Sequence, residues 1–359
     1  MIYYFRLALA AMLALTASGA VAADRIRLVA QKTGTLAWEL DIIKEHGLDK
    51  KANLEIETLE LASPEAGKIA LKGGSADIIV SDWTWVARER ALGDGLVYYP
   101  YLSTLGAVMV SAQSPIKSVV DLKGRKLGVA GGPLDKSWLL LRALALRSGL
   151  ELKTQATIVF GAPPLLSEKS LQGEIEATLT FWNFCADLEA KGQRRAIDME
   201  DVVRRLGASG PVAIIGYVFD GAWAARNRSA VDRFLAIARQ AKDILAASEA
   251  EWQRLAPRIG TADRNTLAIY RQRYRDAIPR RAVDDEEADA RALYKILAEI
   301  GGTDLVGPGR ELDRGSFYWP SRRRLGGAEA RGAAPVGPWK CWQVRWSGSP
   351  STPMSPVRP

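Results

Sequence analysis

Residues 131–137, GGPLDKS, are of types that suit the binding of an acidic or strongly polar ligand. Gly131, Gly132 and the proline after them reverse the chain behind a short apolar run, and Asp135 or Ser137 can cap the helix that follows. Such a loop leaves backbone N–H groups free to meet an anion. A strand-to-helix turn with nothing bound explains the same residues equally well. The segment matches neither GxGxxG nor GxxxxGK[ST], so a nucleotide is not indicated.

A second loop of this kind, QKTGT at residues 31–35, follows the first predicted strand at residues 25–30. Thr35 can serve as the N-cap of a helix that is expected to run over residues 36–46 and to stop at the next glycine. Lys32 adds a full positive charge beside this helix N-terminus. The sequence therefore predicts two strand-to-helix loops that both favour a negatively charged group.

An internal repeat is the most informative feature of the sequence. LKGGSAD leads into the apolar run IIVS and then into DWTW at residues 82–85, and LQGEIE leads into ATLT and then into FWNF at residues 181–184. Each half ends a helix on glycine, places an acid before a buried strand, and ends that strand on Trp-x-aromatic. Two similar α/β lobes with such strand ends are typical of a ligand cleft between domains. Each tryptophan can equally be a core residue that covers the end of a sheet.

The chain offers little for catalysis or metal binding. Two cysteines, Cys185 and Cys341, and a single histidine, His46, cannot form a zinc or haem site. A Ser-His-Asp triad would depend entirely on His46, which lies at a predicted helix end and is better explained as a solvated side chain. We therefore expect no cofactor, no metal and no enzymatic activity.

The first residues have the features of a secretory signal peptide. Residues 1–23 contain a lone Arg6, an apolar run and the small-residue sequence AVAA, which predicts cleavage near Ala22 or Ala23 and export of the mature chain. No later stretch is long and apolar enough for a membrane helix, so the mature protein is expected not to span the membrane.

The net charge of +8 is a property of the C-terminal end. Residues 320–359 hold six Arg and one Lys against one Glu, are rich in Gly, Pro and Ser, and show no periodicity, which predicts a disordered basic tail. With that tail and the signal set aside, the charge is close to neutral, so we expect no nucleic-acid binding.

The order of predicted elements indicates an α/β fold with parallel sheets that are covered on both faces. Strands and helices alternate up to a strongly apolar run at residues 211–218, which is expected to return the chain to the first lobe. Helices are then predicted at residues 230–255, 262–277 and 284–299.

The sequence resembles the periplasmic substrate-binding proteins of ABC importers, in the group for sulfonates, taurine, nitrate and thiamine precursors. The resemblance rests on QKTGTL at residues 31–36, LKGGSADI at 71–78, SPI at 114–116 with DLKGRKLGV at 121–129, and GEIEA at 173–177. It implies the type II fold of periplasmic binding proteins, in which two α/β lobes close on a ligand cleft about a hinge of two crossovers. The first lobe would comprise residues 24–106 and 214–319, and the second residues 107–213.

The resemblance implies a monomeric, non-catalytic protein that captures a small organic acid and delivers it to an inner-membrane ABC permease. A sulfonate or carboxylate with an aromatic or alkyl body would satisfy both the helix N-termini and the tryptophans. Two alternatives stay open, a partner or sensor protein on the same clamp, and an enzyme of the thiamine-precursor or menaquinone-pathway type. The expected ligand shell lies at or just beyond the carboxyl ends of strands: Gln31, Lys32, Thr35, Trp38, Asp82, Trp83, Trp85, Gly131, Gly132, Asp135, Trp138, Trp182 and Asn183.

Overall fold

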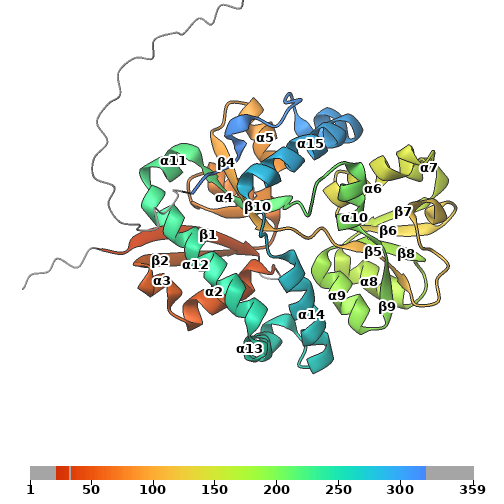
Figure 1. Cartoon of the computed structure of the whole chain (residues 1–359), viewed down its shortest axis with the longest axis horizontal. Coiled ribbons are helices and arrows are strands. Elements are labelled where there is room, and N and C mark those ends of the chain that lie inside the picture. The colour runs from red at the N-terminus through yellow and green to blue at the C-terminus, as the bar shows by residue number, and fades with distance from the viewer. Residues whose placement is uncertain (1–21, 32–33, 321–359) are drawn as a thin grey trace, which may run out of the picture. The chain divides into compact units, whose positions relative to one another are not determined.

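A computed structural model describes residues 22–31 and 34–320. The predicted signal peptide, Lys32 and the predicted basic tail lie outside these residues, apart from the chain ends at 22–23 and 320. The described chain is a mixed α/β structure with helices around its sheets (Figure 1). Its strands form one five-stranded sheet and two smaller sheets, of two and three strands, which a single bridge joins into a second five-stranded arrangement. Its strands are β1 (Asp24–Gln31), β2 (Leu54–Leu61), β3 (Ile79–Asp82), β4 (Leu96–Leu102), β5 (Ala107–Ser111), β6 (Lys126–Ala130), β7 (Thr157–Gly161), β8 (Ala177–Thr180), β9 (Gln193–Asp198) and β10 (Ile215–Asp220).

The helices follow the strands closely along the chain, as the alternating pattern predicted. They are α2 (Leu36–Glu45), α3 (Leu48–Lys51), α4 (Pro64–Lys72), α5 (Trp83–Ala91), α6 (Lys136–Arg147), α7 (Leu152–Gln155), α8 (Pro163–Leu171), α9 (Trp182–Ala190), α10 (Met199–Leu206), α11 (Gly221–Arg226), α12 (Arg228–Ala247), α13 (Glu249–Ile259), α14 (Arg264–Ala277) and α15 (Val283–Val306). Short 3-10 turns lie at Val119–Leu122 and Arg314–Ser316.

The two sheets have the same strand plan, which explains the internal repeat. In the first, β1 pairs in parallel with β2, a bridge from Leu28 to Ile78 joins β1 to β3, and β3 continues antiparallel to β10 and then β4. In the second, the order is β7-β6-β8-β5-β9, with β6 parallel to β7 and β8, and β5 antiparallel to β8 and β9. The repeated strands β3 and β8 therefore occupy equivalent places. We call the parts built on these sheets the first lobe and the second lobe.

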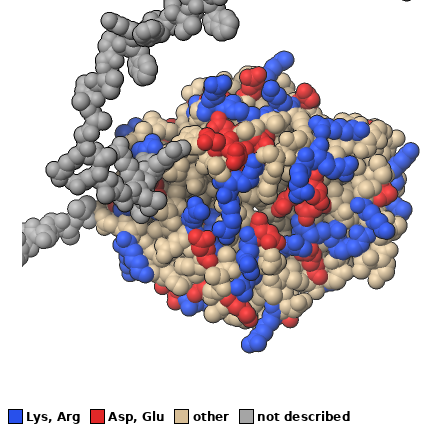
Figure 2. All heavy atoms as spheres, viewed as in Figure 1, with Lys and Arg blue, Asp and Glu red and all other residues tan. Residues whose placement is uncertain are grey.

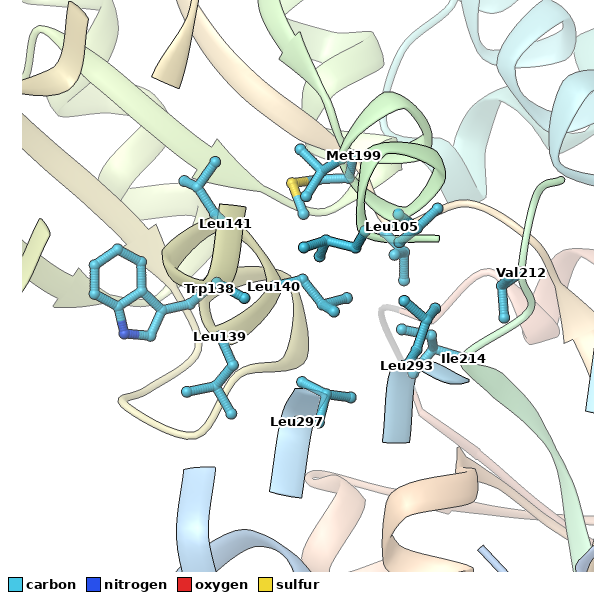
Figure 3. Close-up of a cluster of buried hydrophobic side chains, with 14 of the residues drawn as sticks. Leu105, Trp138, Leu139, Leu140, Leu141, Met199, Val212, Ile214, Leu293 and Leu297 are labelled. Atoms are coloured by element: carbon cyan, nitrogen blue, oxygen red, sulfur yellow. The ribbon is translucent and has the colours of Figure 1, made fainter. Parts of the chain in front are cut away.

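Apolar packing joins the lobes behind the strand ends. Figure 3 shows Leu140 of α6 directed toward Leu293 of α15 and toward Ile214, which lies just before β10. All three belong to one buried cluster that draws residues from both lobes. Burial of this surface is the main stabilising contribution here, at roughly 25 cal/mol per Å² of apolar area.

Three element boundaries can be compared with the sequence predictions. In the apolar run at residues 211–218, the strand β10 begins only at Ile215, because side chains from other elements bond the backbone of Ala213. The helix predicted at 230–255 breaks at Ser248, whose hydroxyl accepts the Glu251 N–H and caps α13. The helix predicted at residues 284–299, with its end at Gly301, does break at this point, because Gly302 has non-helical φ and ψ of 61° and −162°, and a second helical segment follows it to Val306.

Candidate ligand-binding site

The carboxyl ends of strands from the two lobes meet in the structure. The first lobe contributes the segment after β1 and the segment after β3, and the second contributes the segments after β6 and β8. Two contacts fix this meeting: an ion pair between Asp82 and Lys136, and an edge-to-face contact between Trp38 and Trp182 with ring centroids 5.8 Å apart. The candidate site therefore lies where open α/β sheets bind ligands.

Asp82 is the N-cap of α5 and is fully engaged within the protein. Its Oδ1 accepts the Trp85 N–H at 2.9 Å and the Thr84 hydroxyl, and its Oδ2 accepts from Lys136 Nζ at 2.8 Å. Burial by itself would raise the pKa of Asp82, but the Lys136 charge and these hydrogen bonds outweigh it and lower that pKa to about 2. The carboxylate therefore stays ionised and bridges the two lobes.

Lys136 is a residue of the site that sequence reasoning missed. It is the first residue of α6, and burial, which would lower its pKa, is outweighed by Asp82, Asp135 and Glu65, so that its pKa is raised. A lysine in the first turn opposes the helix dipole, and such a position calls for compensating acids. That mismatch, visible in GGPLDKS, was the signal that could have identified it.

Five aromatic rings form a cluster around the second of these contacts, between Trp38 and Trp182. Trp38 of α2 makes edge-to-face contacts with Trp182 of α9, with Trp252 of α13 and with Tyr270 of α14 at 5.6 to 5.8 Å. Tyr274 of α14 lies 6.1 Å from Trp182 and 5.7 Å from Trp252. Trp182 has 7% of its surface exposed, so a ligand could reach its edge only with a small displacement of these rings.

Two of the predicted tryptophans are core residues with no exposed surface. Trp83 donates from its indole N–H to the Ala213 carbonyl at 3.1 Å and packs against Tyr294. Trp138 lies on the side of α6 away from Leu293 and makes an edge-to-face contact with Phe160 (Figure 3). We leave both rings out of the site proposed below. Trp85 is half-buried, and its ring lies 5.3 Å from the Lys68 ammonium.

The glycine loop forms as predicted, but its helix N-terminus is already capped. Gly131 has φ of +88°, a conformation that L-residues rarely adopt, and Gly132 has open space where a side chain would stand. Asp135 caps α6 by accepting the Trp138 N–H at 3.1 Å, and burial is the main reason why the pKa of Asp135 is raised. Because Asp82 and Asp135 occupy the ends of α5 and α6, those ends are less available to a ligand anion.

The helices α2 and α9 differ from α5 and α6 in that no side chain caps their N-termini. Thr35 stands at the N-cap position of α2, yet its hydroxyl lies 3.3 Å from the Tyr101 hydroxyl instead of bonding a first-turn N–H. Gln31 ends β1, and Asn183 lies in the first turn of α9; both are half-buried. First-turn N–H groups without a side-chain cap suit an anionic group of a ligand.

Groups that could support catalysis are occupied in other ways. Burial raises the pKa of the Cys185 thiol to about 12, and His46 Nε2 lies 3.0 Å from Glu251 Oε1 at the end of α2. Among residues 22–31 and 34–320, no cluster of His, Cys, Asp and Glu has the makeup of a metal site. Over the same residues, no helix is long and apolar enough to cross a membrane. Figure 2 shows acidic and basic side chains interspersed on one face of the molecule.

Solved structures with a similar fold are binding proteins. The periplasmic aliphatic sulphonate binding protein SsuA from Escherichia coli matches with a TM-score of 0.65 and 22% identity over 87% of this chain and 97% of its own. The alkanesulfonate-binding protein SsuA from Xanthomonas axonopodis pv. citri, bound to MOPS, matches with a TM-score of 0.62 and 19% identity over 83% and 99%. The periplasmic nitrate-binding protein NrtA from Synechocystis PCC 6803 matches with a TM-score of 0.50 and 13% identity over 65% and 66%.

These matches confirm the type II periplasmic-binding-protein fold that the sequence motifs predicted. No curated protein sequence matches the chain significantly. A family model described as NMT1/THI5 like matches residues 42–251, which is more than half of the chain and includes the repeated strands and most of the candidate site. The chain belongs to the NMT1/THI5-like family.

Proposed function

We propose that this protein is the periplasmic solute-binding component of an ABC importer and that it captures a small organic acid between its lobes. The observation that supports this most directly is that Lys136 and the N-termini of α2 and α9, which no side chain caps, follow the carboxyl ends of strands from the two lobes, as do the rings of Trp38 and Trp182. A cation and helix N-termini without a side-chain cap suit a sulfonate or carboxylate, and the indoles suit an aromatic or alkyl body. The named relatives bind sulphonate, alkanesulfonate and nitrate, which agrees with an anionic ligand.

Export, assembly and domain limits belong to the same proposal. Cleavage of the signal near Ala22 or Ala23 would release a monomer that docks on an inner-membrane permease and catalyses nothing itself. The first lobe would comprise residues 24–106 and 214–319, and the second residues 107–213. The mass of the exported protein tests the cleavage, since an intact N-terminal methionine would exclude it.

A thermal-shift panel tests the ligand class. The panel contains MOPS, alkyl and aromatic sulfonates, carboxylates, nitrate, pyrimidines and quaternary amines. A ligand at about 100 times its Kd adds about 2.7 kcal/mol to the free energy of unfolding, which is easily detected. We expect sulfonates or carboxylates with an apolar body to raise the melting temperature more than nitrate does. A shift with quaternary amines alone would contradict the anionic ligand.

Substitutions of the ion pair should change affinity in opposite directions. Lys136→Gln removes the cation and should weaken binding of an anionic ligand at least about tenfold, because a hydrogen bond to a charged group contributes about 1.5 to 3 kcal/mol. Asp82→Asn removes the internal competitor for Lys136 and should strengthen that binding. Calorimetric titration of both variants with the best anion from the panel measures this. The opposite pair of signs would show that Lys136 is not the group that holds the anion.

A protein partner is the second candidate, because the rings of Trp38 and Trp182 already contact each other across the lobes. If no compound in the panel changes the melting temperature, a partner or sensor role becomes the better explanation. The thiamine-precursor enzymes that share this type of scaffold use a cysteine-rich motif and a substrate histidine. Here Cys185 is buried and His46 lies against Glu251, which argues against that role.

A further inference from the structure

A buried charged pair lies directly behind the candidate site. Glu39, in the first turn of α2, has no exposed surface, and Lys242 of α12 has 5%. Lys242 Nζ donates to Glu39 Oε2 at 2.6 Å. Burial lowers the pKa of Lys242, although the neighbouring Glu39 acts in the opposite direction. The charged groups of Glu39 and Lys242 are therefore both buried away from water, at a place where apolar side chains are the usual occupants.

Tyrosine hydroxyls complete the coordination of Glu39. Tyr274 of α14 donates to Oε1 at 2.5 Å, and Tyr217 of β10 donates to Oε2 at 3.1 Å. Lys242 also donates to the Tyr217 hydroxyl at 3.0 Å. Replacing a buried ion pair by apolar residues is often neutral or even stabilising, so stability alone is a weak reason for this network. A role in setting geometry explains it better.

Tyr101 links this network to Thr35 at the start of α2, on the first-lobe side of the site. The Lys242 ammonium lies 4.6 Å from the centre of the Tyr101 ring, and that ring packs edge-to-face on Tyr217 at 5.2 Å. The Tyr101 hydroxyl then contacts the Thr35 hydroxyl at 3.3 Å. No side chain caps α2, and its start is held by this contact with β4 together with local backbone bonds, in which the Ala37 and Trp38 N–H groups donate to the Gly34 and Thr35 carbonyls.

Tyr274 links the Glu39 carboxylate to the second lobe. While its hydroxyl bonds Glu39, the Tyr274 ring lies 6.1 Å from Trp182 at the start of α9. Arg273, the residue just before Tyr274 on α14, bonds Glu189 of α9 with two nitrogens at 2.8 and 2.5 Å. Glu39 is therefore linked to Thr35 on one side of the site and to Trp182 on the other.

We propose that the Glu39–Lys242 pair is a positioning element of the ligand site, which sets the start of α2 through Tyr101 and the placing of Trp182 through Tyr274. This inference rests on the proposed function for its ligand but not for its geometry. It assigns to these four residues a role in affinity although none of them needs to touch the ligand.

The test compares stability, binding and local exchange in near-isosteric variants. Glu39→Gln or Lys242→Met alone leaves one buried charge without its partner and should lower the melting temperature strongly. The double variant Glu39→Gln/Lys242→Met should recover most of that loss. We nevertheless expect it to bind MOPS at least tenfold more weakly, and to exchange the backbone amides of residues 35–38 at least tenfold faster without ligand. Tyr101→Phe should show the same two effects more mildly.

Tyr294→Phe is the matched control, because its buried hydroxyl donates to the Gly309 carbonyl at 2.8 Å and takes no part in the network. It should leave both MOPS binding and exchange at residues 35–38 unchanged. If the double variant keeps wild-type exchange at these residues, the pair is only structural and the proposal is wrong. If wild type binds neither MOPS nor any compound of the panel, the proposed function fails, whereas the exchange comparison still decides on the positioning role.

Discussion

Replacing Trp83 by alanine is expected to lower the free energy of unfolding by about 3 to 5 kcal/mol, as is usual for a large aromatic removed from a core. The side chain has no exposed surface and packs among residues of the cluster shared by both lobes. The substitution also removes the indole donor of the Ala213 carbonyl, which then keeps only the Tyr98 hydroxyl at 2.5 Å. Urea unfolding of the two proteins measures the loss.

Trp182 is the matched comparison, because it is the first residue of α9 just as Trp83 is the first residue of α5. Trp182→Ala should weaken ligand binding by about 1 to 3 kcal/mol if its ring covers the ligand. Trp83→Ala should leave affinity nearly unchanged under conditions where the variant is folded. If the Trp83→Ala protein were as stable as wild type but no longer bound the ligand, Trp83 would be a residue of the ligand site.

The internal repeat is the part of the sequence from which the two-lobe fold could be predicted. Glycine, acid, buried strand and Trp-x-aromatic recur in both halves, and the structure places β3 and β8 at equivalent positions in two sheets with one plan. The pattern is local, since a strand and the helix after it are specified by neighbouring residues. The fold and the sequence regions of the candidate site were therefore predictable.

Which tryptophan is core and which faces the other lobe was not predictable, because equivalent positions in the repeat differ only in what packs on them. Trp83 lies beneath α15, whereas Trp182 meets α2 and α14. The Asp82–Lys136 pair and the Glu39–Lys242 pair likewise join residues far apart in the chain. No spacing rule connects such partners, so only the tertiary structure identifies them.

The same long-range character explains why β10 begins only at Ile215, in the middle of the apolar run at residues 211–218. Its apolar composition correctly predicted burial, since Val212, Ala213 and Ile214 are all buried. However, a buried segment that crosses between lobes has the same apolar composition as a buried strand, so composition does not distinguish them. Here the Ala213 carbonyl accepts from Trp83 and Tyr98, and its N–H donates to Glu286 at 2.9 Å, so side chains replace a strand ladder.

Glu286 should make the stability of the protein depend on pH. The residue is 1% exposed, and burial is the main reason why the pKa of Glu286 is raised from 4.5 to about 7. Asp285 and Asp289 act in the same direction, whereas the Ala213 N–H and Arg281 oppose it. The folded protein therefore holds a proton that the unfolded chain releases between pH 4.5 and about 7. The free energy of unfolding must fall as pH rises through that window, and the total contribution is about 3 kcal/mol.

Glu286→Gln should remove this contribution, since the amide oxygen can still accept the Ala213 N–H and carries no charge. The variant and wild type should be about equally stable near pH 4.5, and the variant should be more stable by about 3 kcal/mol at pH 8. Urea unfolding at several pH values measures the difference, in which the titration of all other groups cancels. Asp285→Asn, on the exposed side of the same turn, is the control and should show a much smaller change. If the free energies of unfolding of Glu286→Gln and wild type differed by the same amount from pH 4.5 to 8, Glu286 would already be ionised in the folded protein. The Ala213 N–H and Arg281 would then be sufficient to stabilise its charge.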